Sequence, residues 1–299
     1  MASSDDRWTR AVRARDYPAA WRVSGEALAG RDLATRDDPA LPYHLRWVWD
    51  GRPVDGRHVL VRCYHGLGDT IQFARYLPLL AARAASVTLE GPPRLAALLS
   101  QLPGVDRFVP FDPAHPQPPS ECDLEIMDLA FALRTPPAQL PPPYLQAAPA
   151  PLPEGTVALC WEAGDWDPAR RVPPELLAEL CAARPCLSLV PGPTALPVLN
   201  PDGCPFDMDL TAAWVAGASL VITVDTMIAH LAGAMNRPTW LLLKHDPDWR
   251  WAPERGGSDW YPSIRLYAQE RPGDWNGVIA RLTEDLRAAP LPRTSERVR

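Results

Sequence analysis

The 299-residue sequence lacks the features of several classes of protein. No apolar run approaches the roughly 20 residues that a membrane span requires, so we expect no membrane span. The N-terminus, MASSDDRWTR, has no apolar core of the kind that a secretory signal needs, which makes the cytoplasm the expected location. Lysine is almost absent, with Lys244 alone against 29 arginines, and the formal net charge of −6 argues against a general nucleic-acid-binding protein.

Sequence motifs for metal and cofactor binding are also missing. The six cysteines form no C-x-x-C pair, and three of them lie in or beside apolar strand-like runs, so we expect buried free thiols and no metal site or disulfide. The chain has no G-x-G-x-x-G fingerprint and no P-loop. These absences argue against an NAD-dependent oxidoreductase and against an NTPase.

Composition and periodicity divide the chain into four segments. Residues 1–56 are polar and rich in Arg and Asp, with one predicted helix at 17–29. Over 57–150, and again over 151–290, strand-like and helical runs alternate, which predicts an α/β fold with mainly parallel sheets. Eight prolines between 135 and 155 exclude regular structure there and mark the boundary between these two domains. We expect the end, 291–299, to be a disordered tail.

The alternation predicts particular strands and helices. Strands are expected at 58–64, 86–90, 106–111, 156–161, 186–190, 219–225, 238–243 and 263–268. Helices are expected at 70–84, 93–102, 173–183, 211–218, 226–235 and 274–288. Asp209 is the expected cap of the helix at 211–218, and 123–133 is either a short strand or the start of a helix.

Two strand-to-helix junctions carry the residues best suited to chemistry, because ligands of parallel sheets bind at the carboxyl ends of strands. At the first junction, Asp69 followed by Gln72 is typical of a capping box, and the same carboxylate is also suited to catalysis. Both interpretations stay open. The other loop residues expected on the acceptor side are His65, Gly66, Gly68, Thr70 and Gln72.

The second junction consists of Asp225, Thr226 and His230, at the end of the most apolar strand. Thr226 opens the following helix, where its hydroxyl and backbone N–H can donate to a phosphate. Asp225 is better suited to accept hydrogen bonds from sugar hydroxyls. The alternative is a helix cap next to a packed histidine.

The residues around these junctions resemble one known group. The segments RCYHGLGDTIQFARYLPLLAARAASVTLE, TVDTMIAHLAGAMNRPTWLLL, PDWRW, WYPSIRLY and PGDW follow one another in order. Together they are similar to the glycosyltransferase-like module at the C-terminus of many bacterial tetratricopeptide-repeat proteins. That module is related to the ADP-heptose:lipopolysaccharide heptosyltransferases of glycosyltransferase family 9. The match spans about residues 45–290, and DYPAAWRVSGEALAG also resembles a helix of such a repeat.

The resemblance implies a GT-B fold, in which two Rossmann-like domains face each other across a cleft, here behind a short helical N-terminal extension. It implies that the C-terminal domain binds a nucleotide-sugar and the N-terminal domain a hydroxyl-bearing acceptor, with no metal and no other cofactor. Asp69 matches the family's general base, which takes the proton of the acceptor hydroxyl as that hydroxyl attacks the anomeric carbon. Asp225, Thr226 and His230 match the donor-site motif D-T-x-x-x-H.

The resemblance also implies basic groups that neutralise the leaving diphosphate. In the family a basic residue precedes an apolar-proline pair, and here Arg170 and Arg171 precede such a pair, so the choice between them stays open. Lys244 closes a predicted strand and is expected at the same rim. Aromatic side chains of the loop that follows form either a lid over a sugar or base, or ordinary packing. These are Trp249, Trp251 and Trp260.

Two departures from the family favour another function. Met227 stands where the heptosyltransferases have glycine after D-T, and the loop 162–167 carries three acids where a diphosphate is expected. The alternative is therefore a catalytically silent, glycosyltransferase-like binding or scaffold protein that partners another enzyme of its pathway.

Overall fold

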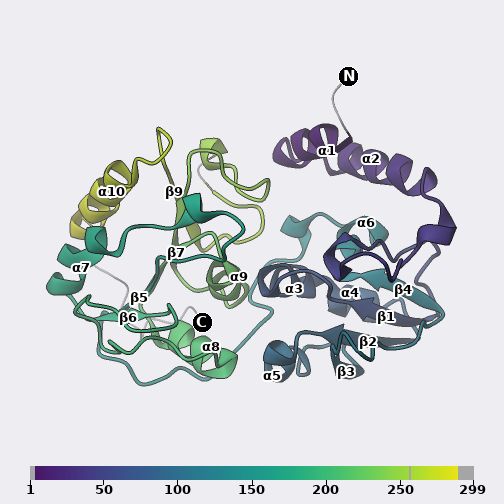
Figure 1. Cartoon of the computed structure of the whole chain (residues 1–299), viewed down its shortest axis with the longest axis horizontal. Helices are drawn as coiled ribbons and strands as arrows, with labels where there is room; N and C mark the ends of the chain where they lie inside the picture. Colours follow the sequence, from purple (N-terminus) through teal and green to yellow (C-terminus); the bar gives the residue numbers. More distant parts are fainter. Residues whose placement is uncertain (1–3, 256, 289–299) are drawn as a thin grey trace. The chain divides into compact units, whose positions relative to one another are not determined.

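The computed structural model describes residues 4–255 and 257–288, and the segment expected to be a disordered tail lies outside them. The chain divides into two compact units, Met1–Pro141 and Pro142–Arg299, and the division falls inside the proline-rich segment 135–155. Each unit carries one parallel sheet with helices packed around it (Figure 1). The α/β class expected from the sequence is confirmed.

Unit 1 contains a four-stranded parallel sheet in the order β3-β2-β1-β4. Its helices and strands are α1 (Ser4–Arg13), α2 (Tyr17–Ala29), β1 (His58–Arg62), α3 (Leu67–Phe73), α4 (Leu77–Ala81), β2 (Ser86–Gly91), α5 (Ala96–Leu99), β3 (Arg107–Pro110), β4 (Cys122–Glu125) and α6 (Leu129–Ala132). Every strand pair is parallel, with His58 opposite Ser86 and Val59 opposite Cys122. The first strand therefore lies between the second and the fourth.

Unit 2 contains a five-stranded parallel sheet in the order β6-β5-β7-β8-β9. Its helices and strands are β5 (Val157–Cys160), α7 (Ala178–Ala183), β6 (Cys186–Ser188), α8 (Met208–Gly217), β7 (Leu220–Val224), α9 (Met227–Ala234), β8 (Thr239–Leu243), β9 (Ile264–Ala268) and α10 (Trp275–Ala288). All residues of β7 are buried, as expected for a central strand of a parallel sheet covered on both faces. The helix α10 packs against β9.

Several element boundaries differ from the sequence prediction. The single helix expected at 70–84 is two helices, α3 and α4, separated by a 3₁₀ turn, because Pro78 lacks an N–H and its ring crowds the preceding turn. The cap of α8 is Asp207 and not Asp209, since the Asp207 carboxylate accepts from the backbone amide of Asp209 at 2.9 Å. The helix α1 was not predicted, because its sequence is almost wholly polar.

All six cysteines are free and buried, as expected for the thiols in apolar runs. One buried charge was not anticipated. Arg62 lies within β1 and is 1% exposed. Its guanidinium pairs with Glu90 of β2 at 2.8 Å and with Asp123 of β4 at 3.1 Å. These two carboxylates satisfy a charge that would otherwise be very costly inside the sheet, and the triad connects three neighbouring strands.

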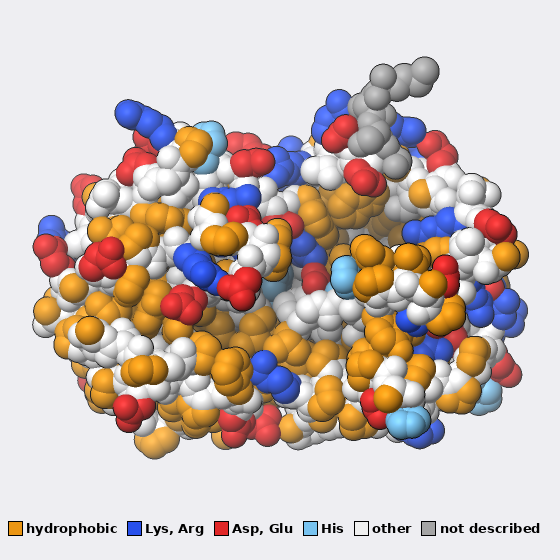
Figure 2. Space-filling view, in the orientation of Figure 1, with side chains coloured by type: hydrophobic (Ala, Val, Ile, Leu, Met, Phe, Trp, Pro, Cys, Tyr) orange, Lys and Arg blue, Asp and Glu red, His pale blue; other side chains and the backbone are white. Residues whose placement is uncertain are grey.

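The surface mixes charges of both signs. Figure 2 shows Lys and Arg side chains interspersed with carboxylates over the visible face, with broad apolar areas between them. Within residues 4–255 and 257–288, no helix is both long enough and apolar enough to cross a membrane.

Candidate functional site

The strand order of each sheet identifies one position where a ligand can bind. In unit 1 the connections leave β1 toward β2 on one side and return to β4 on the other. In unit 2 the same reversal occurs between β5 and β7. Such switch points leave a crevice outside the carboxyl ends of the two strands, and ligands of open α/β sheets bind there. Both predicted junctions follow strands at these switch points.

At the switch point of unit 1, Asp69 lies in the first turn of α3. The cap of this helix is Gly66, whose backbone amide donates to Asp69 Oδ2 at 3.2 Å. The expected capping box, with Asp69 as cap and Gln72 as its partner, is therefore wrong, because the helix begins at Leu67. The carboxylate still stabilises the start of the helix, as the residue that reaches back to the cap. It is only half-buried, which leaves it near solvent.

Next to Asp69, the sheet joins two side chains that are 60 residues apart in sequence. His65 Nδ1 lies 3.0 Å from Glu125 Oε1, at the ends of β1 and β4 respectively. This hydrogen bond raises the pKa of His65, and the carboxylates of Asp69 and Asp128 raise it further. Glu125 is 4% exposed, and its other oxygen accepts from the backbone amide of Met127 at 2.6 Å. Since the carboxylate holds Nδ1, the other imidazole nitrogen is left for a substrate or water.

A second carboxyl of this cluster, that of Asp128, has a raised pKa. Burial raises the pKa of Asp128 from 3.8 to about 7, and the neighbouring Glu125 carboxylate raises it as well. Neither Glu125 nor Asp128 was predicted from the sequence. The available signal was three acids, Asp123, Glu125 and Asp128, within the apolar run CDLEIMDLAFAL. Unit 1 thus places one imidazole and three carboxyl groups around its switch point.

The remaining expected residues of this loop have structural contacts. The Thr70 hydroxyl donates to the Gly66 carbonyl at 3.2 Å, which closes the first turn of α3. Gln72 is fully buried, and Gly68 lies within the helix. Of this group, Gly66 is exposed, His65 and Gly68 are half-buried, and Thr70 and Gln72 are buried.

At the switch point of unit 2, Asp225 follows β7 and Thr226 is the cap of α9. Asp225 is 8% exposed, and burial raises the pKa of its carboxyl, an effect opposed by an interaction with the Trp251 side chain. Thr226 is half-buried, and its backbone carbonyl accepts from the amide of Ala229 at 3.0 Å in the first turn of the helix. His230 lies one turn further on, and its Nδ1 is 3.0 Å from the buried hydroxyl of Tyr261. The three residues lie within one strand-to-helix turn, and His230, 5% exposed, packs against the rings of Trp251 and Tyr261, as the alternative of a helix cap next to a packed histidine predicts.

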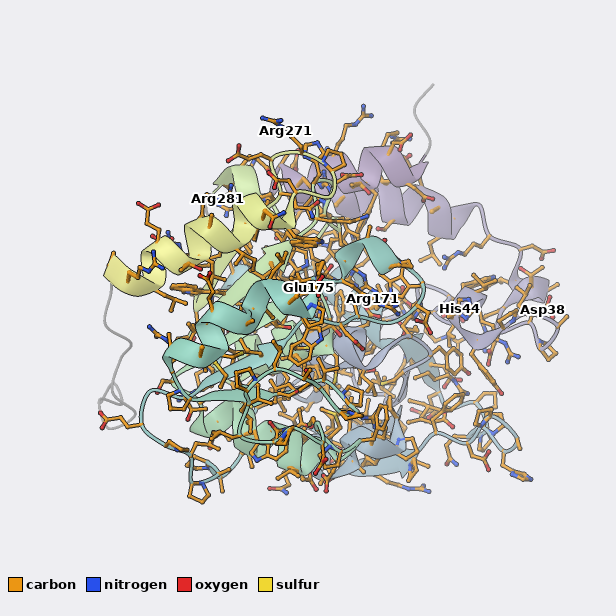
Figure 3. All side chains as sticks on the ribbon, turned by 60° about the vertical axis from the view of Figure 1, so that its left-hand side comes forward. Asp38, His44, Arg171, Glu175, Arg271 and Arg281 are labelled. Atoms are coloured by element: carbon orange, nitrogen blue, oxygen red, sulfur yellow. The ribbon has the colours of Figure 1, made fainter. Side chains whose placement is uncertain are left out.

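The two arginines expected at the diphosphate have different surroundings. Arg170 is 6% exposed and crosses from the loop after β5 to the end of β7, where Nη1 donates to the Asp225 carbonyl at 2.6 Å. Its Nη2 donates to the Gly164 carbonyl at 3.3 Å. Arg171, labelled in Figure 3, pairs instead with the exposed Asp165. Of the two, Arg170 is the one in contact with the second junction.

Further charges surround this junction. Lys244, at the end of β8, pairs with Asp167 at 2.8 Å, and this hydrogen bond lowers the pKa of Asp167. Arg250 pairs with Asp248 at 2.9 Å, and these two residues act electrostatically on the Asp225 carboxyl in opposite directions. Around Asp225 therefore lie the cations Arg170, Lys244 and Arg250 and the carboxylates Asp167 and Asp248, and of these Arg250 and Asp248 were not predicted.

The tryptophans of the loop after β8 pack together. Trp251 is fully buried, with its ring centroid 5.6 Å from that of His230. Trp260 is 4% exposed and lies 6.0 Å from Trp249, edge to face. Trp249 is half-buried under the guanidinium of Arg250, 4.3 Å from its ring centroid. Trp251 and Trp260 thus have the surroundings of core residues, whereas Trp249 keeps part of its surface in solvent.

The part of the chain that the structure describes contains no group of three His, Cys, Asp or Glu side chains arranged to hold a metal ion. The cluster around His65 is a set of hydrogen-bonding and proton-binding groups. The charges around Asp225 are suited to a ligand that carries both phosphate and hydroxyl groups.

No family model matches the sequence, and no curated protein matches it. The folded chain does match solved structures. A glycosyl transferase family 9 protein of Veillonella parvula matches with a TM-score of 0.57 at 11% identity, over 79% of this chain and 98% of that one. The Escherichia coli ADP-heptose LPS heptosyltransferase II matches with a TM-score of 0.54 at 16% identity, over 77% and 98%. The E. coli heptosyltransferase WaaC with ADP matches with a TM-score of 0.52 at 13% identity, over 77% and 98%. The chain therefore has a GT-B-like fold, similar to that of the family 9 glycosyltransferases.

Proposed function

We propose that this protein is a glycosyltransferase that moves a sugar from a nucleotide-sugar to a hydroxyl group, without a metal. The observation that carries the proposal is the arrangement at the second switch point. There, Asp225, Thr226 and His230 lie together at the end of β7, and Arg170 donates to the Asp225 carbonyl at 2.6 Å. This is the position at which an open α/β sheet binds its ligand.

Unit 2 would bind the donor. The amides at the start of α9 and the cations Arg170 and Lys244 suit a diphosphate, and the Asp225 carboxylate suits sugar hydroxyls. The structural neighbour WaaC was solved with ADP, which supports ADP-linked sugars as the first donors to test.

Unit 1 would bind the acceptor, with Asp69 as general base. In the transfer step the acceptor oxygen forms a bond to the anomeric carbon while the bond from that carbon to the diphosphate oxygen breaks. The acceptor proton passes to the Asp69 carboxylate, and the electron pair of the broken bond leaves with the nucleoside diphosphate. Basic side chains and helix amides would stabilise the charge on this leaving group.

We also propose a type of partner and a location in the cell for this protein. The helices α1 and α2 pack against each other as a pair, which supports a relation to tetratricopeptide-repeat proteins and a protein partner from the same pathway. A cytoplasmic location follows if the donor is a nucleotide-sugar of central metabolism.

A catalytically silent binding or scaffold protein is the second candidate. It is favoured by Arg170, which gives hydrogen bonds to the backbone carbonyls of Asp225 and Gly164, and by the pairing of Lys244 with Asp167. Cations already occupied in this way have less to offer a diphosphate.

Turnover distinguishes the two candidates. The wild-type protein is incubated with ADP-, UDP-, GDP- and dTDP-sugars and with glycan and peptide acceptors, and the released nucleoside diphosphate is measured. We expect one donor to be consumed, and Asp69→Asn to reduce the rate by at least about 100-fold while nucleotide binding persists. Full activity in this variant would remove Asp69 from the mechanism, and binding of a nucleotide without turnover by the wild type would favour the scaffold.

A further inference from the structure

The most exposed large apolar side chain of the described chain belongs to Trp166, in the loop after β5. It is 74% exposed, more than Phe206 at 71% and Leu33 at 67%. An indole in water leaves a large apolar area unburied, which is unfavourable unless a ligand or partner covers it.

This exposed indole is held in place from one side. The guanidinium of Arg170 lies 4.0 Å from the ring centroid, a cation–π contact. Arg170 is itself buried and fixed by its hydrogen bonds to the carbonyls of Asp225 and Gly164. One guanidinium therefore connects the indole to the proposed donor site, with one ring face supported and the rest of the ring in solvent. This is the geometry of a stacking platform.

The charges of the loop restrict what can lie on the platform. Glu162 is exposed, Asp165 pairs with Arg171, and Asp167 pairs with Lys244. Such an acidic loop repels a diphosphate. A nucleobase is flat, uncharged and apolar on both faces, so it is the part of a nucleotide-sugar that suits this surface best.

We propose that Trp166 is the stacking platform for the nucleobase of the donor, held in position by Arg170. The inference rests on the proposed function and adds a residue that determines nucleotide affinity. Aromatic stacking accepts any base, and larger purine rings cover more of the indole than pyrimidines do.

The test is isothermal titration with ADP, and with UDP, GDP and dTDP, on the wild type and three variants. Trp166→Ala removes the platform, Trp166→Phe keeps a smaller flat ring, and Phe206→Ala removes another exposed ring of unit 2 as the matched control. Inorganic pyrophosphate, which has no base, is titrated in parallel. Because Trp166 is exposed, all three variants should unfold within about 2 °C of the wild type.

We expect Trp166→Ala to weaken binding of the preferred nucleotide by at least about tenfold, as the loss of one base–aromatic stack implies. Trp166→Phe should recover most of the affinity, and Phe206→Ala should bind as the wild type does. Pyrophosphate affinity should be the same in the wild type and in Trp166→Ala.

Other outcomes overturn the proposal in distinguishable ways. Unchanged nucleotide affinity in Trp166→Ala would show that the base does not stack there, while the proposed function would stand. An equal loss of nucleotide and pyrophosphate would show that Trp166 acts only by holding Arg170. Failure of the wild type to bind any nucleotide would overturn the proposed function itself.

Discussion

Replacing Asp128 with asparagine is expected to stabilise the protein at neutral pH and to leave its stability unchanged near pH 4. Burial raises the pKa of this carboxyl from 3.8 to about 7, with help from the Glu125 carboxylate. Between these values the folded chain keeps a proton that the unfolded chain releases, so the free energy of unfolding falls as the pH rises. Asparagine carries no charge and keeps an oxygen that can accept the hydrogen bond from the Glu125 backbone.

The size of the effect follows from the shift. A rise from 3.8 to about 7 is roughly three units, and at 1.36 kcal/mol each this sets an upper limit of about 4 kcal/mol. Asp128 is half-buried, so its carboxylate can turn toward water once it ionises, and we expect a gain of about 1–2 kcal/mol at pH 8. The gain should grow from pH 4 to pH 7 and stay constant above.

Urea unfolding followed by circular dichroism at pH 4, 5, 6, 7 and 8 measures this difference. The raised pKa of His65 acts in the same direction: the stability that it contributes is present at low pH and is lost as the pH rises through the folded-state value. His65 is present in both proteins, and because the Asp128 carboxylate also raises its pKa, the difference between variant and wild type reports on Asp128 together with this coupling. Asp209→Asn, at an exposed site on α8, controls for the loss of one negative charge. Parallel stability curves for Asp128→Asn and the wild type would refute the reasoning.

Two further predictions concern the interior. A β-carbon at position 233 would overlap the ring of Tyr261, so Gly233→Ala should lower the free energy of unfolding by about 1–3 kcal/mol, and an unchanged urea midpoint would contradict the packing of α9. Burial raises the pKa of Cys122 to about 11 and that of Cys160 to about 12, so a thiol reagent at pH 8 should label the native protein slowly and all six cysteines of the urea-unfolded chain rapidly. Rapid labelling of the native protein would show that the thiols are accessible.

Patterns within short segments predicted much of the fold. The helix expected at 17–29 has those bounds in the structure, and the strand expected at 219–225 is Leu220–Val224. The helical period of apolar residues indicates the helix, and a continuous apolar run indicates the strand, which is buried on both faces. The prediction was less accurate for 70–84, where the apolar pattern continues through Pro78 although the hydrogen bonds of the helix do not.

The candidate site shows the limit of such patterns. The residues at 225, 226 and 230 lie within one strand-to-helix turn, so the sequence could place them together. The contact between His65 and Glu125 depends on β4 lying next to β1, and the sheet order is not visible in the local pattern. The same holds for Arg62, whose burial is tolerable only because strands on both sides supply carboxylates. The stack of Trp166 on Arg170 is local, but nothing in the spacing distinguishes an exposed indole from a packed one.

Thermal unfolding in the presence of ADP, UDP, GDP, dTDP or CMP tests the central claim, a nucleotide site in unit 2, most directly. The controls are Asp225→Ala and Thr226→Ala, and the first of these leaves the backbone carbonyl that Arg170 binds in place. A ligand at 100 times its dissociation constant adds about 2.7 kcal/mol, which for a chain of this size raises the midpoint by roughly 5–10 °C. We expect such a rise with one nucleotide and its loss in both variants. No shift of the wild type with any nucleotide, or the same shift in both variants, would contradict a donor site at the end of β7.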